Sequence, residues 1–171
     1  IAMGNIGDTK FVIPITEKLL SANNPEIRTA AAFALGLIPC DDSRNGLLEA
    51  MKSETEQDVL AQVVKSLGSI GNEDDLAALC GIYPLTGKVS SAYAYSLVRF
   101  ARRNIKNNAS VEKIKSLLKT NDAETIRMCA HAFLYTRNRD LLLGAKDELL
   151  KLTKSSDADT RSRAFTSFGN T

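Results

Sequence analysis

The chain has 171 residues, of which 44% are hydrophobic and 25% are charged, and its formal net charge is +2. This length and apolar content are sufficient for one domain with its own core. The nearly balanced charge does not favour a broad nucleic-acid-binding face, and the sequence shows no amino-terminal signal or membrane-spanning stretch.

A run of small apolar residues that ends in Leu-Gly or a related pair recurs along the whole chain. The six endings are Met3-Gly4, Leu35-Gly36, Leu67-Gly68, Leu97-Val98, Leu134-Tyr135 and Phe168-Gly169. Their spacing of 30 to 37 residues is typical of stacked helical hairpins and not of globular enzymes. We therefore predict an all-α fold, an α-α superhelix in which about five antiparallel helical hairpins stack as a single array over residues 1–171.

The best-preserved copy, residues 8–36, predicts two helices. Apolar residues at three- and four-residue steps place one side of the first helix in the core, namely Val12, Ile15 and Leu19. Asn24 can cap the second helix and Pro25 suits its first turn. Gly36 is expected to close that helix, because glycine is favoured just past a helix end.

This copy resembles the HEAT repeat, especially the short variety named after phycobilisome lyases. The matching residues are Pro25-Glu26-Ile27-Arg28, Ala34-Leu35-Gly36 and Leu67-Gly68-Ser69-Ile70-Gly71. The resemblance implies that Arg28, Arg127 and Arg161, which begin their second helices in register, form a structural ladder. Leu60 and Ser90 stand where two further arginines are expected, so the ladder is interrupted.

Aligning the second helices on Leu35, Leu67, Leu97, Leu134 and Phe168 predicts their buried face. The column eight residues earlier reads Ile27, Val59, Val89, Ile126 and Thr160, and the column four earlier reads Ala31, Val63, Tyr93, Ala130 and Ala164. These positions share one side of a helix, so neighbouring copies must stack to bury them. The longest interval contains residues 102–109, which we expect to form a helix end and a loop.

The resemblance also implies that the second helices line the concave side of the array. The columns expected to be exposed lie six and two residues before each of these anchor residues and one residue after it. Candidate partner-binding residues in these exposed columns, or beside them, are Phe33, Lys65, Tyr95, Arg99 and Tyr135. The three aromatic rings either form anchors of a shallow groove or fill gaps between helices, and the sequence leaves both readings open.

A basic cluster follows the third ending. It consists of Arg99, Arg102, Arg103, Lys106, Lys113, Lys115 and Lys119, with Glu112 as the acidic residue among them. One reading is nucleic-acid binding through residues 99–119, and the other is a solvated helix end. The low net charge of the whole chain favours the second reading.

No arrangement typical of catalysis, cofactor binding or metal binding occurs in the sequence. The cysteines Cys40, Cys80 and Cys129 form no paired spacing, and His131 is the single histidine. The pairs Asp41-Asp42 and Asp74-Asp75 stand at expected helix starts, where carboxylates oppose the helix dipole.

We therefore predict a non-catalytic protein-protein interaction or scaffold module that binds a protein segment on its concave face. Both ends coincide with repeat endings, which suggests a fragment of a longer, bacterial protein. The resemblance leaves two alternatives, the substrate-positioning or assembly region of a cyclophilin-type peptidyl-prolyl isomerase and a bilin lyase or isomerase. The basic cluster leaves a third, the nucleic-acid binder described above.

Overall fold

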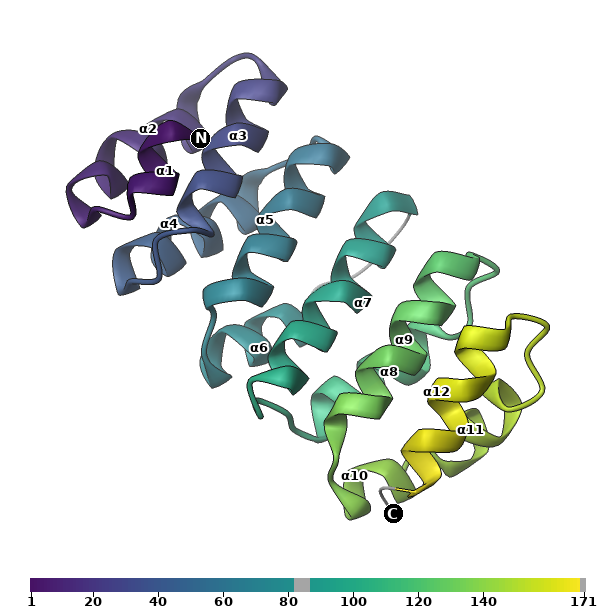
Figure 1. The fold of residues 1–171 in the computed structure, drawn as a ribbon. Helices are drawn as coiled ribbons and strands as arrows, with labels where there is room; N and C mark the ends of the chain where they lie inside the picture. The colour runs from purple at the N-terminus through teal and green to yellow at the C-terminus, as the bar shows by residue number, and fades with distance from the viewer. Residues whose placement is uncertain (82–86, 170–171) are drawn as a thin grey trace.

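The computed structural model describes residues 1–81 and 87–169. The regular elements in these ranges are helices, and they follow one another in the order shown in Figure 1. They are α1 (Ala2–Ile6), the short 3-10 helix η1 (Thr9–Phe11), α2 (Val12–Ser21), α3 (Pro25–Leu35), α4 (Asp41–Ser53), α5 (Gln57–Ile70), α6 (Glu73–Cys80), α7 (Gly87–Arg102), α8 (Asn108–Leu117), α9 (Ala123–Thr136), α10 (Arg139–Leu143), α11 (Lys146–Leu152) and α12 (Ala158–Gly169).

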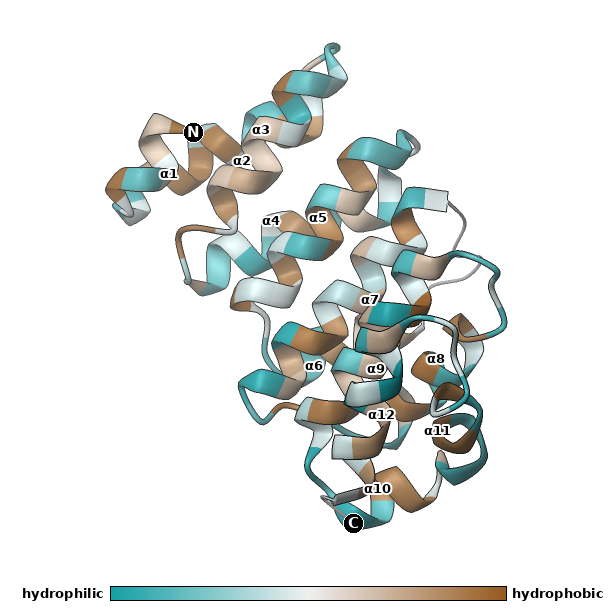
Figure 2. Cartoon of the chain, turned by 45° about the vertical axis from the view of Figure 1, so that its right-hand side comes forward, coloured by the Kyte–Doolittle hydropathy of each residue, from teal (hydrophilic) through white to brown (hydrophobic). Residues whose placement is uncertain are grey.

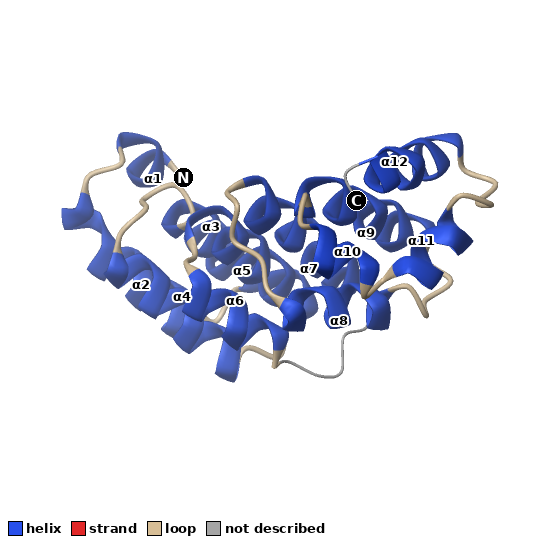
Figure 3. Cartoon of the chain, turned by 90° about the horizontal axis from the view of Figure 1, so that it is seen from below, coloured by secondary structure: helices blue, strands red, loops and turns tan. Residues whose placement is uncertain are grey.

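The helices form two layers that curve together into a crescent. Figure 3 shows α1, α3, α5, α7, α9 and α12 along its inner side and α2, α4, α6, α8 and α11 along its outer side. Successive inner helices pack on one another, and the two termini lie at opposite ends of the row (Figure 1). The predicted all-α solenoid of about five stacked hairpins is confirmed.

The first complete hairpin, α2 and α3, follows the sequence pattern closely. Val12, Ile15 and Leu19 are between 1% and 6% exposed, as their spacing predicts. The Asn24 side chain accepts a 2.8 Å hydrogen bond from the Glu26 backbone N–H, and Pro25 is the first residue of α3. The cap and the helix start are therefore those expected from the sequence.

Gly36 stands just past the end of α3, as expected, and it also has a second purpose. Its φ is −65°, which is ordinary right-handed backbone, so α3 does not end in a left-handed glycine cap. A Cβ on Gly36 would lie 2.6 Å from Oγ of Ser66 on the next inner helix. That hydroxyl donates a 2.8 Å hydrogen bond to the Ala32 carbonyl, one turn before the glycine. The glycine allows close approach of two helices.

The same contact recurs between α5 and α7. A Cβ on Gly68 would lie 2.7 Å from the Cα of Ser96, and the Ser96 hydroxyl donates a 2.7 Å hydrogen bond to the Val64 carbonyl. Both serines are buried, so their hydroxyl groups are satisfied by the neighbouring backbone. The Leu-Gly endings thus set the spacing of the inner helices.

The register that the sequence predicted for the buried face of α9 is wrong by one residue. Thr125, Cys129 and Phe133 are each 0% exposed and follow one another at four-residue steps, whereas Leu134 is half-buried. Phe133 therefore takes the position that Leu97 has in α7. Phe133 and Leu134 are adjacent and both apolar, so their hydrophobicity did not distinguish the two registers.

Ile27 also departs from the expected buried column, because it is 48% exposed. The preceding inner helix, α1, spans five residues and packs with Gly4 against Ala34, near the other end of α3. The start of α3 is therefore not covered by α1. Figure 2 shows apolar residues on the helices of this end, where further large apolar side chains are exposed, including Ile1, Met3, Ile6 and Ile13.

The long interval after the third ending contains the expected helix end and loop. Helix α7 ends at Arg102, and the Asn107 side chain caps α8 by accepting a 2.8 Å hydrogen bond from the Ser110 backbone N–H. Asn104 between them has φ 64°, a left-handed conformation that asparagine tolerates.

Candidate functional site

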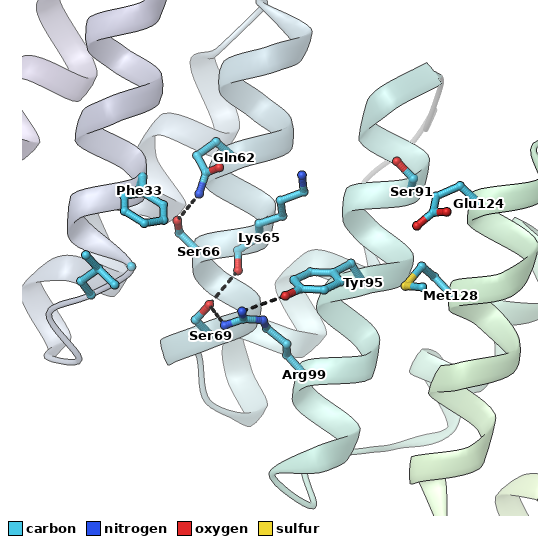
Figure 4. Close-up of a pocket in the computed structure, with 12 residues that line it drawn as sticks. Phe33, Gln62, Lys65, Ser66, Ser69, Ser91, Tyr95, Arg99, Glu124 and Met128 are labelled. Atoms are coloured by element: carbon cyan, nitrogen blue, oxygen red, sulfur yellow. Dashed lines mark hydrogen bonds between the residues drawn. The ribbon is translucent and has the colours of Figure 1, made fainter. Parts of the chain in front are cut away.

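A cleft of about 450 Å³ opens on the concave side of the array, across four successive inner helices and the turn after α3 (Figure 4). Its lining contains four of the five candidate partner-binding residues, namely Phe33, Lys65, Tyr95 and Arg99. The remaining lining residues are Gly36, Leu37, Gln62, Ser66, Ser69, Ser91, Glu124 and Met128. The cleft therefore draws its side chains from residues almost one hundred positions apart.

The repeat places these side chains in two parallel rows. Residues two positions before the endings form one row, which reads Phe33, Lys65 and Tyr95 along α3, α5 and α7. Residues two positions after the first residue of each ending form the other row, which reads Leu37, Ser69 and Arg99. Positions four residues apart lie on one side of a helix, so each hairpin contributes one side chain to each row.

Phe33 and Lys65 are exposed, while Tyr95 is half-buried. Phe33 is 41% exposed, which is a large exposed fraction for an aromatic residue in a helix that packs on both neighbours. The ring therefore contributes to the cleft wall rather than to the core.

The Arg99 guanidinium lies between the rows and is held by two hydroxyl groups. One Nη donates to Oγ of Ser69 on α5, and the other donates a 2.8 Å hydrogen bond to the Tyr95 hydroxyl (Figure 4). The guanidinium carbon also lies 4.9 Å from the centre of the Tyr95 ring, within cation–π range. Arg99 is thus oriented by neutral partners on two helices.

A second, wider cleft of about 710 Å³ adjoins the first. The two share Phe33, Gln62, Lys65 and Ser91, so they form one continuous surface over α3, α5 and α7. The second cleft also has the first-turn residues Glu26, Asp58 and Lys88, of which Lys88 and Asp58 form an exposed 2.7 Å ion pair.

Tyr135, the fifth candidate, lies outside both clefts. Its ring is 5.0 Å from the His131 ring and 5.3 Å from the Arg102 guanidinium. In the corrected register of α9, His131 and Tyr135 stand two residues before and after Phe133, so they continue the two rows beyond the cleft. The sequence alone did not place His131 on this face, and the corrected register is the signal that does so.

Burial lowers the pKa of His131, and the positive charges of Arg163 and Arg102 lower it further against the opposing charge of Asp159. His131 is therefore held more strongly in its neutral form than an exposed histidine at the same pH.

Comparison with known proteins identifies the repeat. The family described as HEAT repeats matches residues 13–97. Residues 13–97 are HEAT repeats. The expected HEAT resemblance is thereby confirmed over the segment that carries the two clearest Leu-Gly endings.

Solved structures show the same architecture along nearly the whole chain. A designed armadillo repeat protein in complex with the peptide (KR)4 is 16% identical, with a TM-score of 0.66, and the match covers 99% of this chain and 90% of that one. A second designed armadillo repeat protein is 17% identical, with a TM-score of 0.63 and the same coverage. An engineered protein is 19% identical, with a TM-score of 0.65, over 93% of this chain and 78% of that one. A search of curated proteins found no match.

The three arginines at the starts of the second helices share some contacts and differ in others, and Arg28 donates to the carbonyls of Ala22 and Asn23 in the loop before its own helix. Arg28 forms a bidentate pair with Glu54 at the end of α4, through hydrogen bonds of 2.7 and 3.1 Å. Arg161 donates to the backbone carbonyls of Ser155 and Ser156 in its own hairpin, and Arg127 pairs with Glu124 of its own helix. Arg28 alone of these three side chains bridges to the next hairpin.

The basic cluster of residues 99–119 is divided among separate environments in the helical array. Arg103 donates to the carbonyls of Gly71 and Gly68 at the end of α5, at 2.6 and 3.0 Å. Lys113 is 2% exposed, with its ammonium 5.0 Å from the Tyr93 ring, and Lys115 forms a 2.9 Å ion pair with Glu112. The cluster therefore does not form a continuous basic face.

Within residues 1–81 and 87–169, no three histidine, cysteine or acidic side chains lie close enough together to hold a metal ion. The acidic residues at the helix starts have structural contacts: Asp41 pairs with Arg44, and buried Asp75 joins a capping box with Asn72 and lies 2.9 Å from Arg44. In the same part of the chain, no helix has both the length and the apolar character needed to cross a bilayer.

Proposed function

We propose that the chain is a non-catalytic protein-binding module whose concave face docks an extended segment of another protein. The observation that carries this proposal is the pair of adjoining clefts, which present Phe33, Lys65, Tyr95 and Arg99 on three successive helices. A surface of this shape offers apolar anchors with polar groups beside them, as peptide-binding grooves do.

The energetics of the array favour such a role. The inner helices are fixed by close backbone contacts at Gly36 and Gly68, so the cleft is already ordered before a partner arrives. Binding then costs mainly the ordering of the partner segment and of a few side chains. A designed armadillo repeat protein of the same fold was solved with the peptide (KR)4, which supports a peptide as the occupant.

The test begins with selection of peptides from a random dodecapeptide display library on the full chain. The selected peptides are then measured by fluorescence anisotropy against Phe33→Ala and against Phe165→Ala, which truncates a 62% exposed ring on α12 outside both clefts. We expect Phe33→Ala to raise Kd about tenfold or more, since it removes an apolar anchor. Phe165→Ala should leave Kd within about twofold.

Thermal melting of the same variants separates binding from folding. Phe33→Ala and Tyr95→Ala should melt within a few degrees of the wild type, because neither ring is fully buried. A large loss of stability without a change in peptide affinity would assign these rings to the core and contradict the proposal.

A further inference from the structure

The Arg99 guanidinium is a charged group whose own partners are neutral. Its two hydrogen bonds go to the hydroxyls of Ser69 and Tyr95, which fix its position without cancelling its charge. A guanidinium has five N–H donors, so three remain without a hydrogen-bond partner within residues 1–81 and 87–169. Arg99 is one of the residues that line the 450 Å³ cleft.

The charges around Arg99 make this cleft electropositive. Lys65 lines the same cleft, and the acidic residue of the lining, Glu124, is already paired with Arg127 of its own helix. Arg103 lies one turn beyond Arg99, and the pKa of Arg103 is lowered first by burial and then by the positive charge of Arg99. An anion that enters the cleft therefore meets a cation that is oriented in advance.

Apolar side chains flank the guanidinium in the lining. Phe33 and Leu37 come from α3 and the turn after it, and Met128 comes from α9, beyond Tyr95. Adjacent packed helices lie roughly 8–10 Å apart, and an extended chain rises about 3.3 Å per residue. If an extended partner segment binds Arg99 through a carboxylate, its residues about three positions before and after that carboxylate thus lie over the neighbouring inner helices.

We propose that the cleft recognises an acidic protein segment, in which an Asp or Glu carboxylate binds Arg99 and flanking apolar side chains contact the cleft walls. This inference rests on the proposed protein-binding function and specifies its partner. Planar bidentate pairing suits a guanidinium whose orientation is already fixed. A uniformly basic segment such as (KR)4, which the designed armadillo neighbour binds, would instead place cations beside Lys65 and Arg99.

The experiment uses the peptides selected from the dodecapeptide library on the full chain. We expect them to share an Asp or Glu at one fixed position with apolar residues on both sides. Replacing that residue with its amide should raise Kd roughly tenfold or more, the typical effect of losing a charge-assisted hydrogen bond. Arg99→Ala should raise Kd similarly and abolish the difference between the acid and amide peptides.

Matched variants keep the test decisive. Arg102→Ala removes an exposed cation from the same helix outside both clefts, and it should leave Kd within about twofold. Tyr95→Phe keeps the ring and the Arg99 charge but removes one of the two groups that position the guanidinium. It should weaken acid peptides more than their amide versions, and it provides the answer if Arg99→Ala fails to fold.

The outcomes distinguish this inference from the proposed function. Peptides that depend on Phe33 but lack an acidic residue and ignore Arg99→Ala would leave protein binding intact and overturn carboxylate recognition. Failure to select any Phe33-dependent peptide would overturn both. A twelve-nucleotide single strand that bound in an Arg99-dependent manner, with no peptide selected, would assign the site to phosphate and also overturn both.

Discussion

The Ser96 hydroxyl on α7 donates a 2.7 Å hydrogen bond to the Val64 carbonyl on α5. This bond joins two hairpins through the backbone of one and a side chain of the other, beside the point where Gly68 allows the helices to touch. One hairpin earlier, the Ser66 hydroxyl donates an equivalent hydrogen bond to the Ala32 carbonyl. The inner layer that carries the cleft is therefore fixed at its helix-to-helix contacts.

The Gly68 contact predicts the effect of adding a single methyl group. In Gly68→Ala the new Cβ would lie 2.7 Å from the Cα of Ser96, so one helix must move, and we expect a loss of about 1–3 kcal/mol in unfolding free energy. Gly144→Ala is the control, because its nearest atom would lie 3.4 Å away, and it should change stability by less than about 0.5 kcal/mol. Urea denaturation of both variants measures the difference. Equal stability of the two would contradict the close-contact account.

The corrected register of α9 predicts unequal costs for two adjacent truncations. Phe133 is fully buried, so Phe133→Ala should cost about 3–5 kcal/mol of unfolding free energy. Leu134 is half-buried, and Leu134→Ala should cost less than half as much. The same denaturation measurement applies. A larger loss of unfolding free energy for Leu134→Ala would contradict the corrected register and support the one inferred from the Leu-Tyr ending.

The Arg28 contact makes stability depend on pH through Glu54. Burial raises the pKa of Glu54, but hydrogen bonds from Arg28 and from the Thr55 and Glu56 backbone N–H groups outweigh burial and bring the pKa below its ordinary 4.5. The unfolded carboxylate thus takes up its proton at a higher pH than the folded one. Its stabilisation is complete above the unfolded pKa and is lost as the pH falls through the folded pKa.

Glu54→Gln should therefore lower the melting midpoint at pH 7 by roughly 3–6 °C, and the gap from the wild type should close as the pH is lowered below 4.5. Glu17→Gln, an exposed glutamate on α2, should show no such gap. Melting curves at several pH values test both statements. A gap for Glu54→Gln that stays constant down to pH 3 would show that the ionised carboxylate is not what stabilises the fold.

Thiol labelling tests the burial of α9 independently. Cys129 is 0% exposed and its burial raises the pKa of the thiol, so it has both poor access and little thiolate. Iodoacetamide at pH 8 should modify it at least about ten times more slowly than half-buried Cys40, as followed by peptide mass spectrometry. In urea the two rates should converge. Equal rates in the native protein would contradict the packing of this helix.

Periodicity made the layered architecture predictable from sequence. The spacing of Leu35 and Leu67 requires hairpins that bury a face only by stacking, and the exposed columns located Phe33, Lys65 and Tyr95 correctly relative to one another. The register of α9 was not predictable in this way, because Phe133 and Leu134 satisfy the same hydrophobic pattern one residue apart.

The contacts that organise the cleft were not visible for a different reason. Ser69 and Arg99 occupy the same column of successive repeats, but a serine and an arginine in a sequence carry no mark of pairing. Gly36 matched a helix-end signal, yet its partner Ser66 lies 30 residues later in the next hairpin. Such contacts depend on helix spacing, which the repeat pattern does not specify.

The methionine methyl groups offer the most direct test of the central claim, that a protein segment occupies the concave cleft. Met128 lines the cleft, whereas Met51 lies on outer-layer helix α4 and Met3 lies on α1. The measurement is a titration of methyl-labelled protein, followed by NMR, with the tightest peptide selected from the library. We predict a saturable shift of the Met128 methyl resonance with Met51 unchanged. Saturable shifts at Met51 or Met3, with Met128 unchanged, would place the partner elsewhere and contradict the account.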